Sequence, residues 1–409
     1  MNAAPLLTRV RVEDYKSIAR CDVTLSPFTV LLGLNAAGKS NFLDALHFLR
    51  DALRDGPAEA VASRGGLDNV LRRVPQPTDT CSIAVDLRIP GPGPEDPPWR
   101  AHYSLTLARP DAPAASLRVR VAREHAELGL EDASPDAHFT VEDGVATDPA
   151  DSRTAGGRLR PGSLYLPLLS VSEPYARLHT ALTSMFFYEP DLATLRDARP
   201  DPGTDALAED GRDLGAVLAR LAPAHRRRVS DYASAIVPRL TEVSSTPLTG
   251  DYLAARIALD TGPDGAPREF RAESMSEGTI RAIGLLAALY QPPARDGRIS
   301  LLAVEEPELA LHPRAAGALY DALTEAAESG LQVLVTTQSG ELLDRDEADL
   351  SAIRMVEAVD GLTTIGPADE VSRSIVRDGL ATVGELMRSD QLHPEPSTPS
   401  SGNAPGDAA

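Results

Sequence analysis

Residues 33–40 read Gly33-Leu34-Asn35-Ala36-Ala37-Gly38-Lys39-Ser40, and this run fits the pattern G-x-x-x-x-G-K-[ST] at every fixed position. The glycines of such a run let backbone N–H groups turn inward around an anion, and the final hydroxyl can bind Mg²⁺. The chain has only two lysines, Lys16 and Lys39, among its 40 Lys and Arg residues. A compact ammonium reaches β- and γ-phosphate oxygens better than a planar guanidinium does. The run therefore predicts a nucleotide-binding loop.

The residues around this run predict the strand and the helix that a phosphate-binding loop requires. Phe28–Leu32 is typical of a buried strand that enters the loop. After the loop, apolar residues recur at helical spacing, namely Phe42, Leu43, Leu46, Leu49 and Leu53. Bound phosphates would then lie at a helix N-terminus. This frame disfavours the alternative of a glycine-rich turn before an ordinary helix, and we expect residues 33–40 and Asn41 to bind ATP with Mg²⁺.

Composition is typical of a soluble globular protein. The 409 residues leave room for two lobes, and 42% of them are hydrophobic. The longest apolar run, Ala282–Tyr290, is too short to cross a bilayer, and no signal-peptide pattern opens the chain. Cys21 and Cys81 show no C-x-x-C spacing, which indicates neither a zinc site nor a disulfide framework. We expect a cytoplasmic protein that does not bind membranes.

The net charge of −20 argues against a uniformly basic nucleic-acid surface but leaves local basic stripes open. The run His225–Arg228 is the densest candidate, and Arg118, Arg120 and Arg123 form a second one. A solvated helix or strand face is the alternative interpretation of each cluster. DNA is therefore a partner that the sequence allows only through local Arg clusters.

Apolar patterning divides the chain into four segments. Residues 1–144 hold the loop and six expected strands, the last three typical of an antiparallel sheet: Leu7–Val12, Cys21–Leu25, Phe28–Leu32, Cys81–Ile89, His102–Ala108 and Leu117–Val121. Residues 145–245 are predicted to form a mainly helical inserted lobe. Residues 246–392 include two strands typical of a parallel sheet and the helix between them: Ile299–Val304, Leu331–Thr336 and Arg314–Glu328. Residues 393–409 should be a disordered tail, because they are rich in Pro, Ser, Gly and Ala.

The strand Leu301–Glu306 is apolar and ends in two carboxylates. A magnesium nucleotide site needs such groups opposite its phosphate loop. We expect Glu305 and Ser40 to hold hydrated Mg²⁺, and Glu306 to polarise the attacking water. Taken alone, the segment would fit a strand that ends in a solvated acidic turn. It lies more than two hundred residues after Lys39, so something large is inserted between the two halves of the site.

The segment Ser274–Thr279 opens a buried helix. A serine and a glycine at a helix N-terminus can bind an anion through the side chain and the backbone N–H groups. Taken alone, Ser276 fits a plain N-cap. Taken with the loop and the carboxylate pair in this order, Ser276, Gly278 and Thr279 indicate a seat for the γ-phosphate.

Together these segments resemble the ABC-type ATPases of the RecF, SMC and OLD group, and most closely a stand-alone RecF-like predicted ATPase of the AAA family. The resembling segments are Val10–Ser17, Gly33–Asn41, Leu207–Leu221, Ser276–Thr279 and Glu305–Pro313. The resemblance implies an α/β P-loop NTPase of the ABC-head type. Such a head has a mostly parallel sheet as its core and an antiparallel β subdomain, here with the large helical insertion. The resemblance also implies ATP hydrolysis.

In that family two heads associate head-to-tail, and each ATP lies between the phosphate loop of one subunit and the signature of the other. The resemblance therefore implies an ATP-dependent homodimer in which Ser276, Gly278 and Thr279 complete the site in trans. Two positions depart from the family pattern, since Glu305 stands where ABC-type ATPases usually have Asp, and Gln338 where the family commonly has His. Gln338 can orient a water or donate to the γ-phosphate but cannot titrate, which affects turnover more than binding.

Two further side chains have weaker signals. Gln76 is a weak candidate for the glutamine of the family's Gln-loop. His312, in the run Leu311-His312-Pro313, fits a structural capping residue better than a catalytic one.

Three functions compete. The first is a DNA-associated ATPase of RecF type, acting in repair or in defence against foreign DNA. The second is the nucleotide-binding subunit of a transporter, which the large insertion and the segment Glu305–Pro313 disfavour. The third is an ATP-gated dimerisation switch with little turnover that recruits an effector such as a nuclease. The missing heptads exclude the arm of an SMC protein, and because about seventy residues follow Gln338, we expect any nuclease to be a separate polypeptide.

Overall fold

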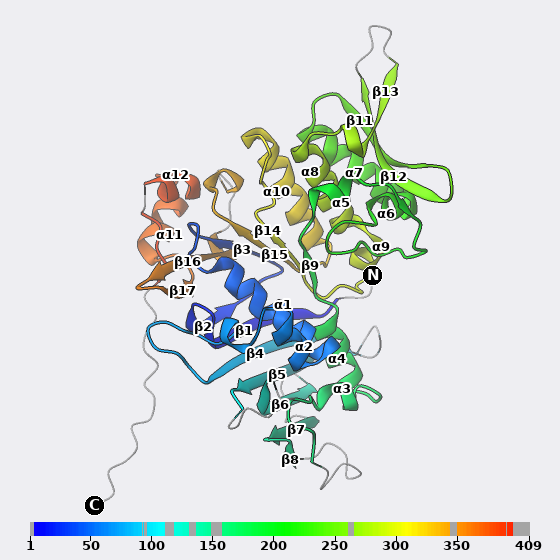
Figure 1. Ribbon diagram of the computed structural model, residues 1–409. Helices are drawn as coiled ribbons and strands as arrows, with labels where there is room; N and C mark the ends of the chain where they lie inside the picture. Colours follow the sequence, from blue (N-terminus) through cyan, green and yellow to red (C-terminus); the bar gives the residue numbers. More distant parts are fainter. Residues whose placement is uncertain are drawn as a thin grey trace, which may run out of the picture.

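The computed structural model describes residues 4–91, 93, 96–110, 118–130, 136–148, 158–260, 266–343, 350–389 and 391–395. Figure 1 shows their arrangement in three sheets with helices packed around them. The strands are β1 Leu6–Tyr15, β2 Ile18–Thr24, β3 Phe28–Leu32, β4 Thr80–Ile89, β5 Trp99–Ala108, β6 Arg120–Leu130, β7 Ala137–Glu142, β8 Val145–Asp148, β9 Phe186–Tyr188, β10 Arg199–Pro200, β11 Leu240–Pro247, β12 Tyr252–Asp260, β13 Pro267–Arg271, β14 Leu302–Glu305, β15 Val333–Thr337, β16 Ile353–Val359 and β17 Leu362–Gly366. The α-helices are α1 Lys39–Asp55, α2 Pro57–Ala62, α3 Leu166–Leu169, α4 Tyr175–Thr183, α5 Leu192–Arg196, α6 Leu214–Arg220, α7 Pro223–Ile236, α8 Glu277–Tyr290, α9 Pro292–Arg295, α10 Pro313–Glu328, α11 Glu370–Arg377 and α12 Val383–Arg388.

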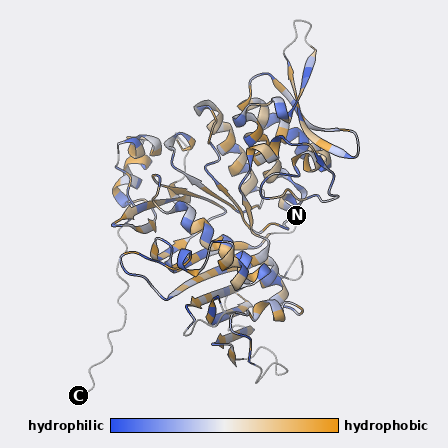
Figure 2. Cartoon of the chain, viewed as in Figure 1, coloured by the Kyte–Doolittle hydropathy of each residue, from blue (hydrophilic) through white to orange (hydrophobic). Residues whose placement is uncertain are grey.

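A six-stranded, mostly parallel sheet forms the centre of the molecule, in the order β17-β16-β3-β15-β14-β9. Every pair in it is parallel except β16 with β17. Strands β3 and β15 are buried along their whole length, because helices cover both faces of the sheet. Figure 2 shows that most of the central strands are hydrophobic. The expected parallel sheet is confirmed.

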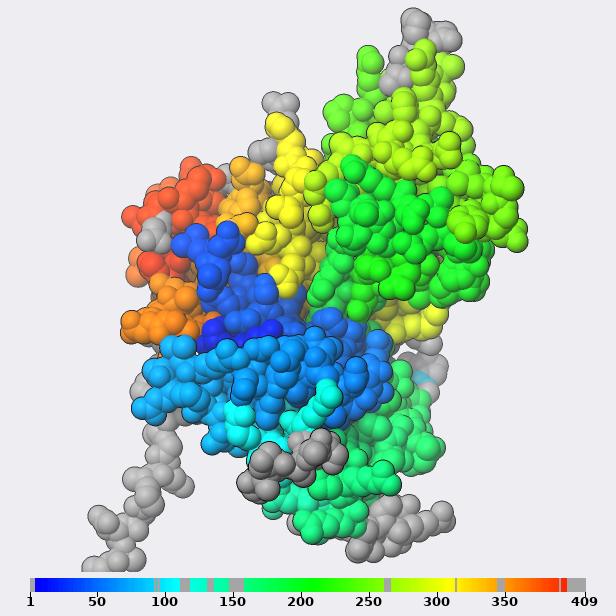
Figure 3. Space-filling view, viewed as in Figure 1, coloured from blue at the N-terminus to red at the C-terminus, as the bar shows by residue number. Residues whose placement is uncertain are grey.

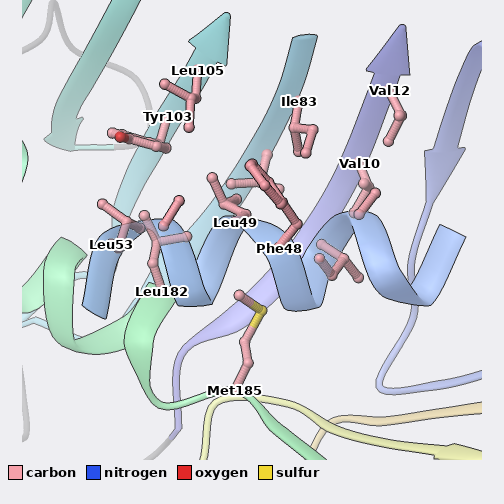
Figure 4. Close-up of a cluster of buried hydrophobic side chains, with 14 of the residues drawn as sticks. Val10, Val12, Phe48, Leu49, Leu53, Ile83, Tyr103, Leu105, Leu182 and Met185 are labelled. Atoms are coloured by element: carbon pink, nitrogen blue, oxygen red, sulfur yellow. The ribbon is translucent and has the colours of Figure 1, made fainter. Parts of the chain in front are cut away.

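Helix α1 and a seven-stranded antiparallel sheet cover one face of the central sheet. The antiparallel order is β2-β1-β4-β5-β6-β7-β8. In Figure 4 the helix lays Phe48, Leu49 and Leu53 over strands that carry Ile83 and Tyr103. The expected antiparallel subdomain is therefore present. Its strand β6 begins at Arg120 and extends well beyond Val121, where we expect it to end, and Leu117 lies outside the described residues.

A second core lies on the other face of the sheet, under α6, α7, α8 and α10. A smaller sheet of β10, β12 and β11, with β13 paired to β12, packs against these helices. Figure 1 shows β11–β13 projecting away from the body. In Figure 3 the N-terminal residues, in blue, lie between the C-terminal residues, in orange and red, and the green residues of this lobe.

Residues 145–245 differ from the single helical lobe that apolar patterning suggests. Phe186–Tyr188 lies in this segment but forms β9, the edge strand of the central sheet, paired in parallel with β14. A strand of this length is too short to show a period-two pattern. Helices α3 and α4 belong to the core beneath α1, whereas α5, α6 and α7 belong to the core around α8. The division of the chain at residues 144, 245 and 392 stays a prediction.

The start of the expected disordered tail is ordered, which corrects that expectation for residues 393–395. Pro394 forms a β-bridge with Ala368, and the N–H of Asp369 donates to the carbonyl of His393 over 3.1 Å. These backbone bonds hold a Pro-containing segment that its composition alone would leave unfolded. Residues 396–409 lie outside the described residues.

The two cysteines do not form a disulfide bond with each other. Cys21 and Cys81 are free and buried, and burial raises the pKa of each thiol to about 12. Among the described residues, no helix combines the length and apolar character that crossing a membrane requires.

Glu325 on α10 forms hydrogen bonds with side chains of α7 and α8. Its carboxylate accepts hydrogen bonds over 2.8 Å from Nε of Arg228 and from the hydroxyls of Tyr232 and Tyr290. The bond from Arg228 is the main cause that lowers the pKa of Glu325 to about 2.

We predict that Glu325→Gln lowers the unfolding temperature near neutral pH. Because the pKa is depressed in the folded state, the carboxylate stabilises the fold above its ordinary pKa of about 4.5 and loses this contribution as the pH falls toward 2. The difference between wild type and variant should therefore shrink over that range in thermal unfolding followed by circular dichroism. The control is Glu328→Gln, because Glu328 is exposed on the same helix. A difference that stays constant with pH would contradict the assignment.

Candidate nucleotide-binding and hydrolysis site

The predicted phosphate loop connects the end of β3 to the start of α1. Leu34, Asn35 and Ala36 are exposed, whereas Lys39 is only 6% exposed. The ammonium of Lys39 folds across the loop and donates to the carbonyls of Gly33 and Leu34 over 2.8 and 3.0 Å. No side chain caps the N-terminus of α1, so its first N–H groups are left to bind an anion. Burial lowers the pKa of Lys39, and the nearby Glu306 and Glu305 carboxylates oppose that shift.

A hydrogen-bond network of Ser17, Asn41 and Thr363 supports the loop. The Thr363 hydroxyl donates to the carbonyl of Ala37 over 3.0 Å and lies 2.6 Å from Oγ of Ser17. Oγ of Ser17 also accepts from the amide of Asn41 over 2.6 Å. Gly38 has φ 104°, and a Cβ there would lie 1.9 Å from the Thr363 hydroxyl. The loop thus requires glycine at this position for two reasons, its left-handed backbone and its contact with Thr363.

The two expected magnesium ligands lie together. Oγ of Ser40 donates to Oε2 of Glu305 over 2.6 Å. Burial raises the pKa of Glu305, and the bond from Ser40 opposes the shift. Among the described residues there is no group of three or more His, Cys, Asp and Glu side chains that could hold a metal. A hydroxyl and one carboxylate fit Mg²⁺, which is usually bound through one or two protein oxygens, with substrate phosphates and waters.

The expected water-polarising carboxylate and the switch glutamine are also in contact. Nε2 of Gln338 donates to Oε2 of Glu306 over 3.0 Å. Their strands pair in parallel, with Glu305 opposite Thr336, and the N–H of Glu306 donates to the carbonyl of Thr336 over 2.8 Å. Glu306 has φ 43°, a conformation that costs a non-glycine residue energy and is often found at functional sites.

Glu189 and His47 join this edge of the sheet, although nothing in the sequence singled them out. The register pairs Val304 with Tyr188, so Glu189 emerges beside Glu305, and its charge raises the pKa of Glu305. His47 stacks on Phe187 with ring centroids 4.5 Å apart, and its hydrogen bond lowers the pKa of Glu189. The only signal was a carboxylate directly after a short aromatic run.

Gln76 is not near the site in any described contact. It lies in an exposed stretch before β4, where its carbonyl accepts from Arg72 over 3.3 Å. Glu189 leaves the central sheet beside Glu305, whereas the role of Gln76 as the glutamine of the Gln-loop stays a prediction.

The predicted signature residues lie at the N-terminus of α8. Ser276 is exposed and caps the helix, since its Oγ accepts from the N–H of Thr279 over 3.2 Å. Gly278 is buried, and a Cβ there would lie 2.3 Å from the carbonyl oxygen of Ala310. Among the described residues, no hydrogen bond or ion pair connects Ser276, Gly278 or Thr279 to the phosphate loop.

The carbonyl of His312 accepts from the N–H of Ala315 over 2.7 Å in the first turn of α10. This backbone contact agrees with a structural capping role for His312.

Ion pairs neutralise much of the two Arg clusters. Arg120 pairs with Asp143, and Arg123 lies 3.8 Å from Glu142. In the other cluster, Arg228 pairs with Glu325. Arg118 and Arg227 are exposed.

The mostly parallel central sheet, the loop between β3 and α1 and the antiparallel sheet define a P-loop fold of the ABC-head type. Residues 28–344 match the family model described as "AAA domain, putative AbiEii toxin, Type IV TA system", and the chain belongs to this family. It is 20% identical over 364 residues to the Old nuclease of Escherichia phage P2, covering 84% of this chain and 58% of that protein. The chain thus spans less than two thirds of this relative.

A solved structure shares the fold. It is the SMC head bound to the C-terminal winged-helix domain of ScpA, with a TM-score of 0.52 and 13% identity, covering 90% of this chain and 100% of that one. The comparisons agree with the resemblance to ABC-type ATPases of the RecF, SMC and OLD group.

We predict that Lys39→Ala abolishes ATP binding, because it removes the cation of the phosphate loop. Titration of the purified variant with a fluorescent ATP analogue measures the affinity. The matched control is Arg227→Ala, which removes an exposed cation far from the loop in sequence and should bind as wild type does. An affinity of Lys39→Ala for ATP equal to that of the wild type would contradict the assignment of residues 33–40 as the phosphate-binding loop.

Proposed function

We propose that this protein binds ATP with Mg²⁺ and hydrolyses it within a head-to-tail homodimer that forms in the ATP state. One observation carries the proposal. The central sheet brings Ser40 within 2.6 Å of Glu305 and Gln338 within 3.0 Å of Glu306 at one edge. Phosphoryl transfer needs this combination of an anion cradle, a metal site and a water-positioning pair.

In this proposal each residue of the candidate site has a separate role in ATP binding or hydrolysis. Lys39 and the N–H groups of the loop hold the phosphates, and Asn41 supports the loop through Ser17. Bound Mg²⁺, held by Ser40 and Glu305, would supply positive charge to the β- and γ-phosphate oxygens. Glu306 takes the proton of the attacking water. The amide of Gln338, which does not titrate, orients that water against Glu306.

A dimer would complete the site. The N-terminus of α8 carries Ser276, Gly278 and Thr279, and within the described residues no hydrogen bond or ion pair joins these three to the loop of the same chain. Leu34, at the loop, is 64% exposed, and Leu309, after the carboxylate pair, is 50% exposed. Burying these two apolar side chains and adding the signature of a second chain would both favour association.

We predict that Glu306→Gln keeps ATP binding and lowers hydrolysis by about 10²–10⁴-fold, the usual effect of losing a general base. The variant should accumulate as an ATP-bound dimer in light scattering. Glu305→Gln is the matched control, because it changes the neighbouring carboxylate and should weaken the dependence on Mg²⁺ instead. A trapped dimer in Glu305→Gln but not in Glu306→Gln would show that the two roles are reversed.

A mixing experiment tests whether the signature acts in trans. We predict that Ser276→Arg leaves ATP binding by the monomer nearly intact but blocks dimerisation and hydrolysis. A heterodimer of Ser276→Arg and Lys39→Ala has one composite site with both defects and one with neither, so a mixture of two inactive proteins should regain partial ATPase activity. If the variants associate and activity stays absent, the sandwich dimer is refuted and Ser276 is an ordinary helix cap.

We further propose that the ATPase acts on DNA, in repair or in defence against foreign DNA. The relation to a phage protein named as a nuclease, and the exposed Arg118 and Arg227, support this role. The alternative is an ATP-gated switch with little turnover that recruits a separate effector such as a nuclease. Gln338 favours that alternative, because it cannot titrate as histidine does. Steady-state hydrolysis that DNA stimulates would support the first function, and slow hydrolysis indifferent to DNA would support the second.

A further inference from the structure

The turn after β14 carries a third carboxylate, Glu308, which has no role in the proposal so far. Oε1 of Glu308 accepts a hydrogen bond from the hydroxyl of Thr337, the last residue of β15. Its Oε2 is buried, and in the described part of the chain it has no hydrogen-bond partner. Burying an unpaired carboxylate oxygen is costly, so such a group calls for an explanation.

Thr337, directly before Gln338, is hydrogen-bonded to Ser339, directly after it. Its side chain is fully buried, and its Oγ1 accepts from the N–H of Ser339 over 3.0 Å. The hydroxyl proton of Thr337 has two acceptors, Oε1 of Glu308 and, over 3.2 Å, the carbonyl of Ser339, and the bond to Glu308 is the shorter of the two. Two neighbouring residues at the end of β15 are therefore held by two carboxylates of one turn, Thr337 by Glu308 and Gln338 by Glu306.

The turn itself is firmly built. The N–H of Leu309 donates to the carbonyl of Glu306, and the N–H of Leu311 donates to the carbonyl of Glu308, each over 2.9 Å. Ala310 has φ 65°, and its carbonyl lies against Gly278 at the start of α8. The turn thus fixes Glu306 and Glu308 relative to each other and contacts the signature helix.

The electrostatic surroundings agree with a role close to the reaction. Burial raises the pKa of Glu308, the bond from Thr337 opposes that shift, the charge of Glu306 raises the pKa further, and the charge of Lys39 lowers it. Glu308 therefore lies within electrostatic reach of both the phosphate loop and the expected general base.

We propose that Glu308 is a positioning residue for hydrolysis: it holds Thr337, and through it the amide of Gln338, against the carboxylate of Glu306. This inference rests on the ATPase function proposed above. Without the bond, the end of β15 loses its side-chain anchor and Gln338 can turn away from Glu306. The contribution is to kcat, because Glu308 does not bind the nucleotide.

The test compares Glu308→Leu, Thr337→Val and the double variant in steady-state ATP hydrolysis. Each single variant should lower kcat by about 10²-fold, the scale of a small misplacement near a reacting group, with KM and ATP affinity close to wild type. The double variant should lose no more, because both changes break the same bond. Glu308→Gln keeps an acceptor oxygen for Thr337 and should recover much of the loss. The matched control is Glu341→Leu, an exposed glutamate shortly after Gln338.

The outcomes separate this inference from the function on which it rests. Wild-type kcat in both single variants, additive losses in the double variant, or a Glu308→Gln variant as slow as Glu308→Leu would overturn the positioning role and leave the ATPase intact. A parallel loss of ATP affinity and thermal stability would mark general damage and also overturn it. No hydrolysis by the wild type would overturn the ATPase function together with this inference.

Discussion

The parallel pairing of β3, β15 and β14 is the constraint on which the candidate site depends. The register places Val335 opposite both Val30 and Val304, so the carboxyl ends of the three strands lie at one edge. The phosphate loop follows β3, Gln338 follows β15, and Glu305 ends β14. In open α/β sheets this edge is where ligands bind. Hydrogen bonds between strands therefore assemble the site from distant parts of the chain.

Burial on both faces keeps that register. Leu31 belongs to the core beneath α1, whereas Val30 and Leu32 belong to the core around α8. A shift of one residue would exchange the faces of every side chain in the strand. Phe48 holds α1 against the antiparallel sheet from the same core. The phosphate loop is thus fixed at both ends, by a buried strand and by a buried helix. The hydrogen bond from Thr363 to the carbonyl of Ala37 restrains its middle.

Chemistry decided which site residues could be predicted. The loop, Glu305 and Glu306 could be predicted from the sequence because their proposed tasks restrict the residue type at fixed spacing, whereas Gln338 was predicted from the resemblance to a family that commonly has His at this position. Ser40 and Glu305, and likewise Glu306 and Gln338, are then found in contact. Glu189, His47 and Thr363 could not be found in the same way. They are common residue types, and their meaning depends on neighbours that only strand pairing or helix packing brings to them.

The Arg clusters show that a pattern in the sequence can also suggest a surface property that the fold changes. A run of like charges in sequence suggests a basic surface, but Arg120 and Arg228 each meet a carboxylate from another part of the fold. Charge counted along the chain is therefore a poor guide to charge on a surface when the neutralising groups come from other elements.

The sequence by itself determined the class of protein, the strand–loop–helix around residues 33–40, the strand that ends in two carboxylates and the mixed α/β fold. Each depends on a local pattern, either a period of apolar residues or a fixed spacing of chemical groups. The tertiary structure alone decided that Phe186–Tyr188 forms the edge strand of the central sheet, and that helices α3 and α4 pack in one core while α5, α6 and α7 pack in the other. These features arise from pairing and packing between segments far apart in sequence, which no local pattern encodes.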